Sequence, residues 1–238
     1  MTKRKLTKTT KVFEQIRQDI LQGHFPPGVK LQMENLKEQY GVGYSPLREA
    51  LSRLVSHGLV RIEEQCGFAV APLSLNELYD LYNIRVYIET LALELAIEHG
   101  DDQWEADILA SWHKYEKYLN RKTDRNLYPA KWDELQKDFL FNLVKACQSP
   151  WLLKLRDILY DQADRYRSIC LNQNYKNKKM LFDVIDENQR LVSAVLARNK
   201  NKALQITKES WQISIKIIAK KLEQQLSVFN KKLSKTKI

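Results

Sequence analysis

The sequence predicts a mainly α fold in two parts: a short N-terminal module with tight turns, followed by an all-α antiparallel helical bundle. Most glycines and prolines fall in the first third of the chain, and apolar residues recur at helical spacing through the rest. Because glycine and proline interrupt regular structure, the first third should hold short elements and the remainder long helices. We place the boundary near residues 72–74, which gives predicted domains over 1–73 and 74–229 and a basic tail over 230–238.

Two helices open the N-terminal module. The first is expected over residues 9–22, where apolar side chains recur at helical spacing until Gly23 ends the run. The second is expected over residues 33–40, with Gly41 as its C-cap. Glycine suits that position because it accepts the left-handed conformation that often ends a helix.

A third helix and a hairpin complete this module. The helix is expected over residues 46–57, with Ser45 as its N-cap and the following proline at its first position. Two short β-rich runs, residues 59–62 and 68–71, flank a glycine-containing turn and predict a hairpin. Helix, helix, tight turn, helix and hairpin is the order of a winged helix-turn-helix, whose last helix can lie in the major groove of DNA.

The second part begins with a capping box formed by Ser74 and Glu77, the spacing in which a serine caps a helix and an acid reaches back to it. This helix should run to about residue 99, where Gly100 closes it. Five more helices are expected at about residues 103–122, 129–147, 150–170, 179–197 and 200–225. Long helices with short links are typical of an antiparallel bundle, and the lysine-rich tail from Asn230 is expected to be mobile.

Composition favours an anionic partner and a reducing compartment. The formal net charge is +10 and the hydrophobic fraction is 44%, so the chain can fill a core and attract nucleic acid. The cysteines Cys66, Cys147 and Cys170 show no metal-binding or disulfide spacing. The N-terminus lacks the apolar core of a signal peptide, and no apolar run is long enough to span a membrane. We therefore expect a cytoplasmic protein.

Four segments carry a resemblance to a known family. Residues 23–31 resemble its "G-x-x-x-PG-x-x-L" signature, and residues 41–54 resemble its "GVSRTPVREALxRL" recognition helix. Residues 57–60 and 67–70 resemble the "xGLV" and "GxxV" pieces of its wing. The region from about residue 10 to 72 is thus similar to the GntR family of bacterial regulators. The resemblance implies a homodimer that binds a palindromic operator in double-stranded DNA.

One departure from the family pattern bears on DNA recognition. The family usually has Ser-Arg where this chain has Gly43 and Tyr44, and an arginine fork reads a guanine in a way that tyrosine cannot. We expect Arg48 to contact a base or phosphate and Arg53 to lie deeper. Ser45 is left open between capping and phosphate binding. Lys30 and Arg61 could bind phosphate or remain solvated. The predicted DNA-binding residues are Lys30, Tyr44, Ser45, Pro46, Arg48, Arg53, Arg61, Gln65 and Gly67.

The helical part resembles the FCD domain of the FadR-like branch, because residues 80–89 are similar to its "DLxExRxxLE" segment. The resemblance implies effector binding and dimerisation. Many such domains hold a divalent metal through one acidic or histidine ligand and three histidines. Those positions fall here on Gln136, Leu140, Asn188 and Ser210, which are poor ligands for zinc or nickel. The histidines present lie elsewhere, so we predict no metal and no cofactor.

A ligand pocket is nevertheless expected in the bundle. Arg85, Gln136, Asn188 and Ser210 each interrupt an apolar helical stripe, and buried polar groups need partners. We expect them to converge on a small-molecule effector, with Arg85 holding a carboxylate and Arg165 as a second clamp. The alternative is that these groups satisfy one another, with Arg85 paired to Glu89 or another acid.

These observations predict a dimeric, sequence-specific DNA-binding regulator, more often a repressor in this family, that responds to a small carboxylate. One alternative is a regulator of the same fold whose pocket has collapsed, so that it has no effector. The other is an enzyme built on a helical bundle. That class would need a nucleophile with a base or a metal cluster, and we find no catalytic residues.

Overall fold

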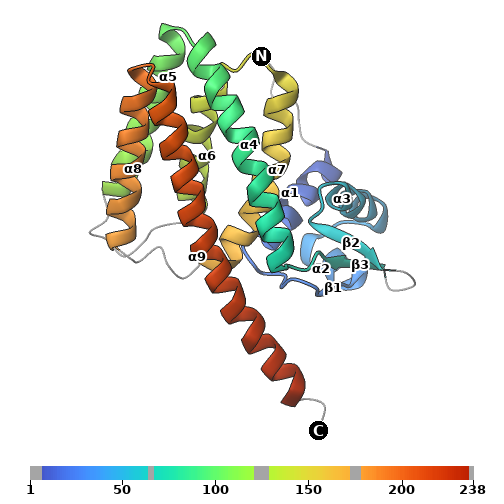
Figure 1. Cartoon of the computed structure of the whole chain (residues 1–238). Coiled ribbons are helices and arrows are strands. Elements are labelled where there is room, and N and C mark those ends of the chain that lie inside the picture. The colour runs from blue at the N-terminus through green and yellow to red at the C-terminus, as the bar shows by residue number, and fades with distance from the viewer. Residues whose placement is uncertain (1–6, 64–66, 121–128, 172–177, 236–238) are drawn as a thin grey trace.

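The computed structural model describes residues 7–63, 67–120, 129–171 and 178–235. It confirms a mainly α fold, with a winged helix-turn-helix module that precedes a helical bundle in the chain and lies beside it (Figure 1). The head, residues 7–73, packs its three helices around a small core that includes Ile16, Leu51 and Val70. Its elements are α1 (Lys8–Leu21), β1 (Lys30–Leu31), α2 (Met33–Tyr40), α3 (Tyr44–Ser56), β2 (Val60–Glu63) and β3 (Gly67–Val70).

Helix α3 begins earlier than the sequence predicted. Its N-cap is Gly43, which has an extended backbone (φ −76°, ψ 171°) and no side-chain capping bond. The prediction of Ser45 as N-cap and of Pro46 at the first position was therefore wrong. Both residues lie inside the first turn, where proline is tolerated because the amides there lack intrahelical acceptors.

The sequence did not predict strand β1. The sheet has the order β1-β3-β2, and all pairs are antiparallel. Lys30 pairs with Ala69, and Val60 pairs with Val70 on the other side of β3. A two-residue strand has too few positions to show alternation, so only its pairing partner reveals it.

The bundle contains long helices whose apolar faces meet in one core. Aromatic rings of α5 and α6 form its centre, with Trp112 and Phe139 centroids 5.3 Å apart and Tyr115 6.0 Å from both. The predicted basic tail is corrected in part, because helix α9 continues through Lys235. The helices are α4 (Leu75–His99), α5 (Asp102–Asn120), α6 (Pro129–Val144), α7 (Pro150–Leu171), α8 (Lys178–Leu196) and α9 (Lys200–Lys235).

Half of the predicted capping box is present at the start of α4. Ser74 Oγ accepts a hydrogen bond of 3.1 Å from the Glu77 amide, as expected of an N-cap. The Glu77 carboxylate, however, is turned toward α7, where it accepts from Arg165 Nη2 at 3.2 Å and from the Tyr166 hydroxyl. The second half of the capping box is therefore missing: Glu77 balances the buried guanidinium of Arg165, and the Ser74 amide donates to the Tyr166 hydroxyl over 3.3 Å instead.

No helix within the described ranges is long and apolar enough to cross a membrane.

Candidate nucleic-acid interface and ligand pocket

Helix α3 has a buried side and an exposed side. Its buried side consists of Leu47, Ala50, Leu51 and Leu54, which anchor it in the core of the head. Tyr44 and Arg48 are exposed and lie four residues apart, so they share one face near the N-terminal end. Ser45 and Pro46 belong to the same first turn. The first turn of α3 is therefore presented outward on a rigid base.

Tyr44 is held against α2. Its hydroxyl donates to the Glu34 carboxylate, and Lys37 Nζ lies 4.7 Å from the centre of its ring. The hydrogen bond to Glu34 raises the pKa of Tyr44 above its ordinary value. The hydroxyl thus stays protonated and is already engaged, so Tyr44 offers DNA mainly the free part of its ring.

The two arginines of α3 lie in different surroundings. Arg48 is exposed, and within the described part of the chain it has no ion pair or hydrogen bond. Arg53 is half-buried, with its guanidinium 4.2 Å from the centre of the Phe13 ring on α1. This contact directs Arg53 into the head and away from the exposed turn of α3. Arg48 is the one of the pair that is available to a ligand.

The wing offers fewer free groups than predicted. Arg61 donates to Glu63 over 2.6 Å, and Lys30 is exposed on β1. Gly67 begins β3 with a φ of +88°, a conformation that favours glycine. Gln65 lies outside the described residues.

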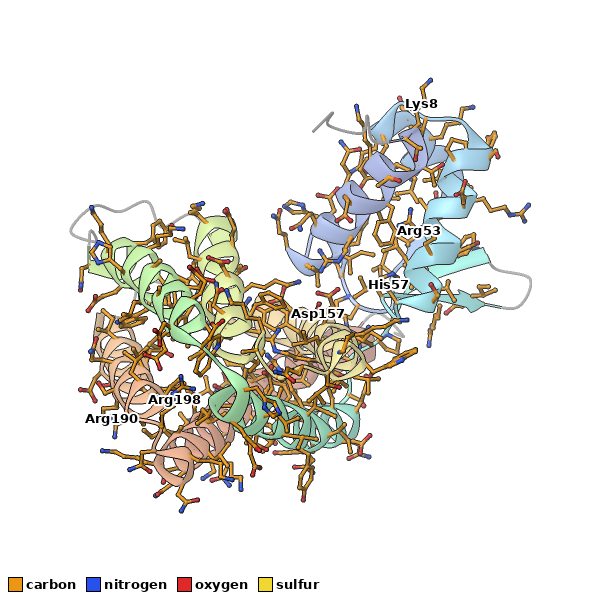
Figure 2. The ribbon with its side chains drawn as sticks, turned by 90° about the horizontal axis from the view of Figure 1, so that it is seen from above. Lys8, Arg53, His57, Asp157, Arg190 and Arg198 are labelled. Carbon is orange, nitrogen blue, oxygen red and sulfur yellow. The ribbon has the colours of Figure 1, made fainter. Side chains whose placement is uncertain are left out.

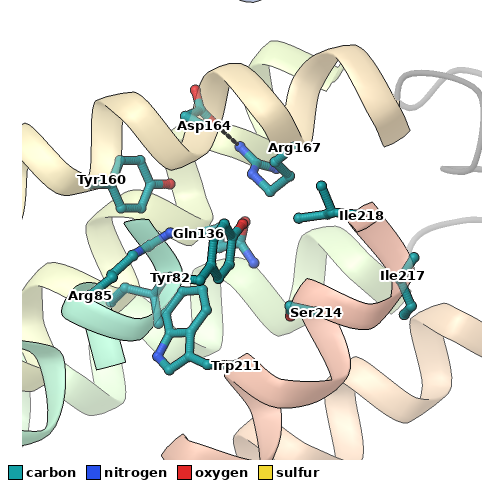
Figure 3. A pocket seen from close by; sticks show the side chains of 11 residues that line it. Tyr82, Arg85, Gln136, Tyr160, Asp164, Arg167, Trp211, Ser214, Ile217 and Ile218 are labelled. Carbon is teal, nitrogen blue, oxygen red and sulfur yellow. Dashed lines mark hydrogen bonds and ion pairs between the residues drawn. The ribbon is translucent and has the colours of Figure 1, made fainter. Parts of the chain in front are cut away.

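The bundle encloses a cavity of about 80 Å³ between α4, α6, α7 and α9 (Figure 3). Polar and aromatic side chains from all four helices point into it, together with Leu140 and two isoleucines of α9. Its polar and aromatic lining consists of Tyr82, Arg85, Gln136, Tyr160, Asp164, Arg167, Trp211 and Ser214.

Arg85 is a buried cation with spare hydrogen-bonding capacity. Its side chain is 4% exposed, and its guanidinium lies 3.9 Å from the centre of the Trp211 ring and 4.9 Å from that of Tyr160. Its nearest acid is Glu89, with Nε 3.5 Å from Oε1, too far for a strong hydrogen bond. Among the residues that the structure describes, neither Nε nor Nη2 has a hydrogen-bond partner. A buried group left in this state is costly unless a ligand or water completes it.

Glu89 is shared between two arginines. Its Oε2 accepts 2.9 Å from Nε of Arg156, a side chain of α7 with no exposed surface. Arg156 also donates from Nη1 to the half-exposed Asp157 carboxylate over 3.3 Å, so two acids face the two guanidiniums. Within the described residues Nε and Nη2 of Arg85 still lack a hydrogen-bond acceptor, and an anionic ligand would supply one.

The other end of the cavity carries one arginine held between two acids. Arg167 donates from Nη1 to Asp133 over 2.7 Å and from Nη2 to Asp164. Burial raises the pKa of the Asp133 carboxyl, although the charge of Arg167 opposes the shift. Burial also raises the pKa of Tyr160, which lies between the two ends, so its hydroxyl remains a neutral donor or acceptor.

Only part of the predicted pocket set converges. Arg85 and Gln136 line the cavity, but Asn188, Ser210 and Arg165 do not. The Asn188 amide donates to the Val184 carbonyl one turn back, and Ser210 bonds the Glu187 side chain. Their polar groups are thus satisfied between neighbouring helices or within one helix.

Arg165 is replaced in the pocket by its neighbours on α7. Tyr160, Asp164 and Arg167 were not predicted to line a pocket, although their spacing already marked one stripe of the helix. Trp211, the residue next to Ser210, was not predicted either. Asp164, Arg167 and Trp211 each lie only one or two positions along the helix from a predicted residue. Apolar periodicity determines the orientation of a helix about its axis poorly when several of its faces are buried.

The residues present do not suit the metal site known from similar domains. Leu140 has no donor atom, and the amide of Asn188 is already used within α8. Within the described residues no group of three or more histidine, cysteine or acidic side chains could hold a metal ion.

Comparison with known proteins gives two family matches. Residues 8–70 match "Bacterial regulatory proteins, gntR family", and residues 80–212 match the FCD domain. The chain is 38% identical over 203 residues to the "HTH-type transcriptional repressor GlaR" of Escherichia coli (strain K12), covering 85% of this chain and 92% of that protein. It is 33% identical over 208 residues to the HTH-type transcriptional regulator BphR of Paraburkholderia xenovorans (strain LB400), covering 87% and 83%.

Solved structures show the same architecture. The structure of McbR/YncC from E. coli superposes with a TM-score of 0.75 at 22% identity, covering 92% of this chain and 100% of that one. A GntR regulator from Rhodococcus sp. RHA1 gives a TM-score of 0.67 at 19% identity, covering 90% and 98%. At these identities the likeness concerns the fold alone.

Proposed function

Because this chain belongs to the gntR family of bacterial regulatory proteins, and is therefore a DNA-binding transcriptional regulator, we propose that it is a repressor controlled by a small carboxylate. The resemblance predicted from the sequence is confirmed, and so is its class, since the family and the matched relatives are regulators and not enzymes. The FCD domain implies a small-molecule effector. The carboxylate, the repression and the dimer described below are our proposals.

The observation that carries the carboxylate is the state of Arg85. Within the described residues two of its nitrogens are buried without a hydrogen-bond partner at the edge of the cavity, and its one ion pair, with Glu89, is long at 3.5 Å. A carboxylate would accept from these nitrogens and bring a second negative charge to Arg85, as carboxylates commonly do at a guanidinium fork. The Trp211 ring beneath the guanidinium holds it in place for such a contact.

The cavity also limits the size of the effector. At about 80 Å³ it is well below the range of roughly 300–1,000 Å³ typical of drug-sized ligands. A compact acid of a few carbon atoms fits this space better than a sugar acid or an acyl chain. Gln136 and Tyr160 supply neutral polar groups for its remaining oxygens.

A second copy of the chain is the partner we propose for the exposed side of the bundle. Helices α4 and α7 pack together, and both carry large exposed apolar residues. Tyr87 is 72% exposed and Trp151 is 70% exposed, which is unusual for such side chains unless another surface covers them. The exposed residues are Ile84, Tyr87 and Leu91 on α4, and Trp151, Leu155 and Ile158 on α7.

Two-fold symmetry would place two α3 helices on the half-sites of a palindrome, with Tyr44 and Arg48 of each nearest the base edges. The name of the similar E. coli protein includes "repressor", which supports repression here. Such a protein would work in the cytoplasm, next to the chromosome.

Selection of bound sequences from random duplex DNA tests the DNA-binding part. A palindrome with two equal half-sites is expected, and a single asymmetric site would argue against the dimer. For the effector, thermal unfolding is measured with acetate, lactate, malonate, succinate, glutarate and citrate. At least one is expected to raise the unfolding temperature of the wild type and not that of Arg85→Gln. Arg190→Gln, an exposed arginine of α8, is the control. No shift with any acid would favour a regulator without an effector.

A further inference from the structure

Helix α7 contacts the pocket on one face and the head on the next. Tyr160, Asp164 and Arg167 form the stripe that lines the pocket. Asp161 and Arg165, one position along from the first two, form a neighbouring stripe that bonds residues of the head. One rigid helix thus touches both functional regions of the chain. Figure 2 shows the head beside the bundle, with His57 at the end of α3 facing the side on which Asp157 of α7 lies.

We propose that Asp161 and Arg165 are positioning residues that hold the DNA-reading head to α7, and that α7 transmits the state of the pocket to α3 through them. This inference rests on the proposed function, because it assigns a route between the effector and the DNA. It goes beyond that function by naming the helix and the contacts that form the route.

The contact of Arg165 is made with the end of the DNA-reading helix itself. Its Nη1 donates to the Gly58 carbonyl over 3.1 Å, and Gln162 on the same helix donates to the His57 carbonyl. His57 is the C-cap of α3 and Gly58 follows it. Carbonyls at a helix C-terminus lack intrahelical donors and carry partial negative charge, so a guanidinium is a well-suited partner.

Burial makes this contact specific. The Arg165 side chain has no exposed surface, and its Nε finds no hydrogen-bond partner in the described part of the chain. Its charge is balanced by Glu77 at the start of α4, over 3.2 Å. Glu77 is half-exposed, so the buried cation also depends on the Gly58 carbonyl. Moving the head away would leave this cation with fewer partners.

Asp161 forms the second attachment. It accepts 2.6 Å from Nη2 of Arg17 on α1 and 3.3 Å from Nζ of Lys137 on α6. Arg17 is 14% exposed, so this ion pair is largely shielded from water and holds a defined geometry. α1 packs on α7 at this point. The head is thus attached through α1 and through the end of α3.

The pocket side of α7 is attached by charges that an anionic ligand would disturb. Arg156 of α7 binds Glu89, the same carboxylate that faces Arg85. Arg167 of α7 binds Asp133 of α6. An anion bound to Arg85 would compete with Glu89 for this cation. It would therefore alter the Glu89–Arg156 ion pair that joins α4 to α7. If α7 has one position when the pocket is empty and another when it is occupied, the ligand changes the balance between them only as far as its affinities for the two differ.

The test compares full-length wild type with Arg165→Gln and Asp161→Asn, using the duplex that the wild type selects from random DNA. Amide hydrogen exchange is measured with and without that duplex. Reciprocity requires that DNA binding at the head alter the pocket if the two are coupled. In the wild type, exchange over residues 82–89 and 156–167 is expected to change by about tenfold on DNA binding.

In both variants the duplex should still protect the amides of α3, while the response of the pocket segments is lost. Arg190→Gln, which also removes an ion-paired arginine but on α8, should respond like the wild type. Arg165→Lys, with one charged group in place of a fork, should restore part of the response. If Arg165→Gln does not fold, Asp161→Asn, at an ion pair nearer the surface, decides the test.

Two results would overturn the inference. One is protection of α3 by DNA in the wild type with no response in the pocket segments. The other is a pocket response in Arg165→Gln and Asp161→Asn equal to that in Arg190→Gln. A wild type in which no duplex protects α3 at all would instead refute the proposed function, and the inference with it.

Discussion

The guanidinium of Arg85 lies 3.9 Å from the centre of the Trp211 ring, so that α4 and α9, far apart in the sequence, meet at one buried cation. The ring lies against the cation, and within the described residues Nε and Nη2 of Arg85 have no hydrogen-bond partner, although Nε is 3.5 Å from Glu89 Oε1. This pairing sets the chemistry of the cavity, because the tryptophan ring stabilises the cation without using any of its hydrogen-bond donors (Figure 3).

Replacing Arg85 should separate ligand binding from stability. Arg85→Met is expected to abolish the thermal shift given by whichever carboxylate stabilises the wild type. The free energy of unfolding should change by less than about 1 kcal/mol, because the lost cation–π contact, about 1–2 kcal/mol, is offset by removing two unpaired buried donors. Urea denaturation measures the second quantity. A loss of several kcal/mol would show that Arg85 is a structural residue and not a ligand-binding one.

The cluster of Arg85, Glu89 and Arg156 should respond unequally to loss of its members. Glu89→Gln removes the buried counter-charge that Arg85 and Arg156 share and leaves only the half-exposed Asp157 beside Arg156, so we expect a loss of about 3–5 kcal/mol in the free energy of unfolding. Arg156→Met leaves the pair of Arg85 and Glu89, which is neutral, so the loss should be nearer about 1.5–3 kcal/mol. Chemical denaturation distinguishes the two, and a greater loss for Arg156→Met would contradict this charge balance.

Replacing the two arginines of α3 should affect different properties: DNA affinity for Arg48 and stability for Arg53. Arg48→Ala is expected to weaken binding to the selected duplex by about 1–3 kcal/mol while leaving the unfolding temperature unchanged, because Arg48 is exposed. Arg53→Ala should lower the free energy of unfolding by about 1 kcal/mol, since it removes the contact with Phe13. Fluorescence anisotropy and calorimetry measure the two effects. Unchanged DNA affinity in Arg48→Ala would remove this residue from the interface.

Tyr44 should determine one position of the operator. Tyr44→Arg restores the residue usual in the family and supplies a fork for guanine O6 and N7. Repeating the selection with this variant should enrich a guanine in each half-site, with a preference of about 1–3 kcal/mol over other bases. Tyr44→Phe, which only breaks the bond to Glu34, serves as the control and should leave the selected sequence unchanged.

The free energy of unfolding should fall with rising pH as the Asp133 carboxyl ionises. Its pKa is higher in the folded protein than the value of 3.8 usual for an aspartate, mainly because it is buried. The folded state therefore binds this proton more tightly than the unfolded state, and stability decreases as the pH rises from the unfolded to the folded pKa. Asp133→Asn keeps an oxygen for Arg167 but cannot ionise, so this decrease should vanish from its plot of unfolding temperature against pH. A curve parallel to that of the wild type would contradict the raised pKa.

Local signals in the sequence were sufficient for much of the fold. Helix α2 has the predicted bounds because Gly41, with a φ of +62°, marks its end within the chain itself. Ser74 likewise caps α4 where its spacing to Glu77 placed it. The family and the division into a head and a bundle also followed from contiguous motifs.

The sequence by itself determined the set of helices and one buried arginine, Arg85. The helices are marked by the periodic spacing of apolar residues, and Arg85 is marked because it interrupts that spacing. The tertiary structure alone decided which residues meet. It paired β1 with β3, placed Arg167 rather than Arg165 at the cavity, and turned Arg165 to the end of α3. The physical reason is that α7 is covered on several sides, so its period indicates burial without showing which neighbour lies against each face.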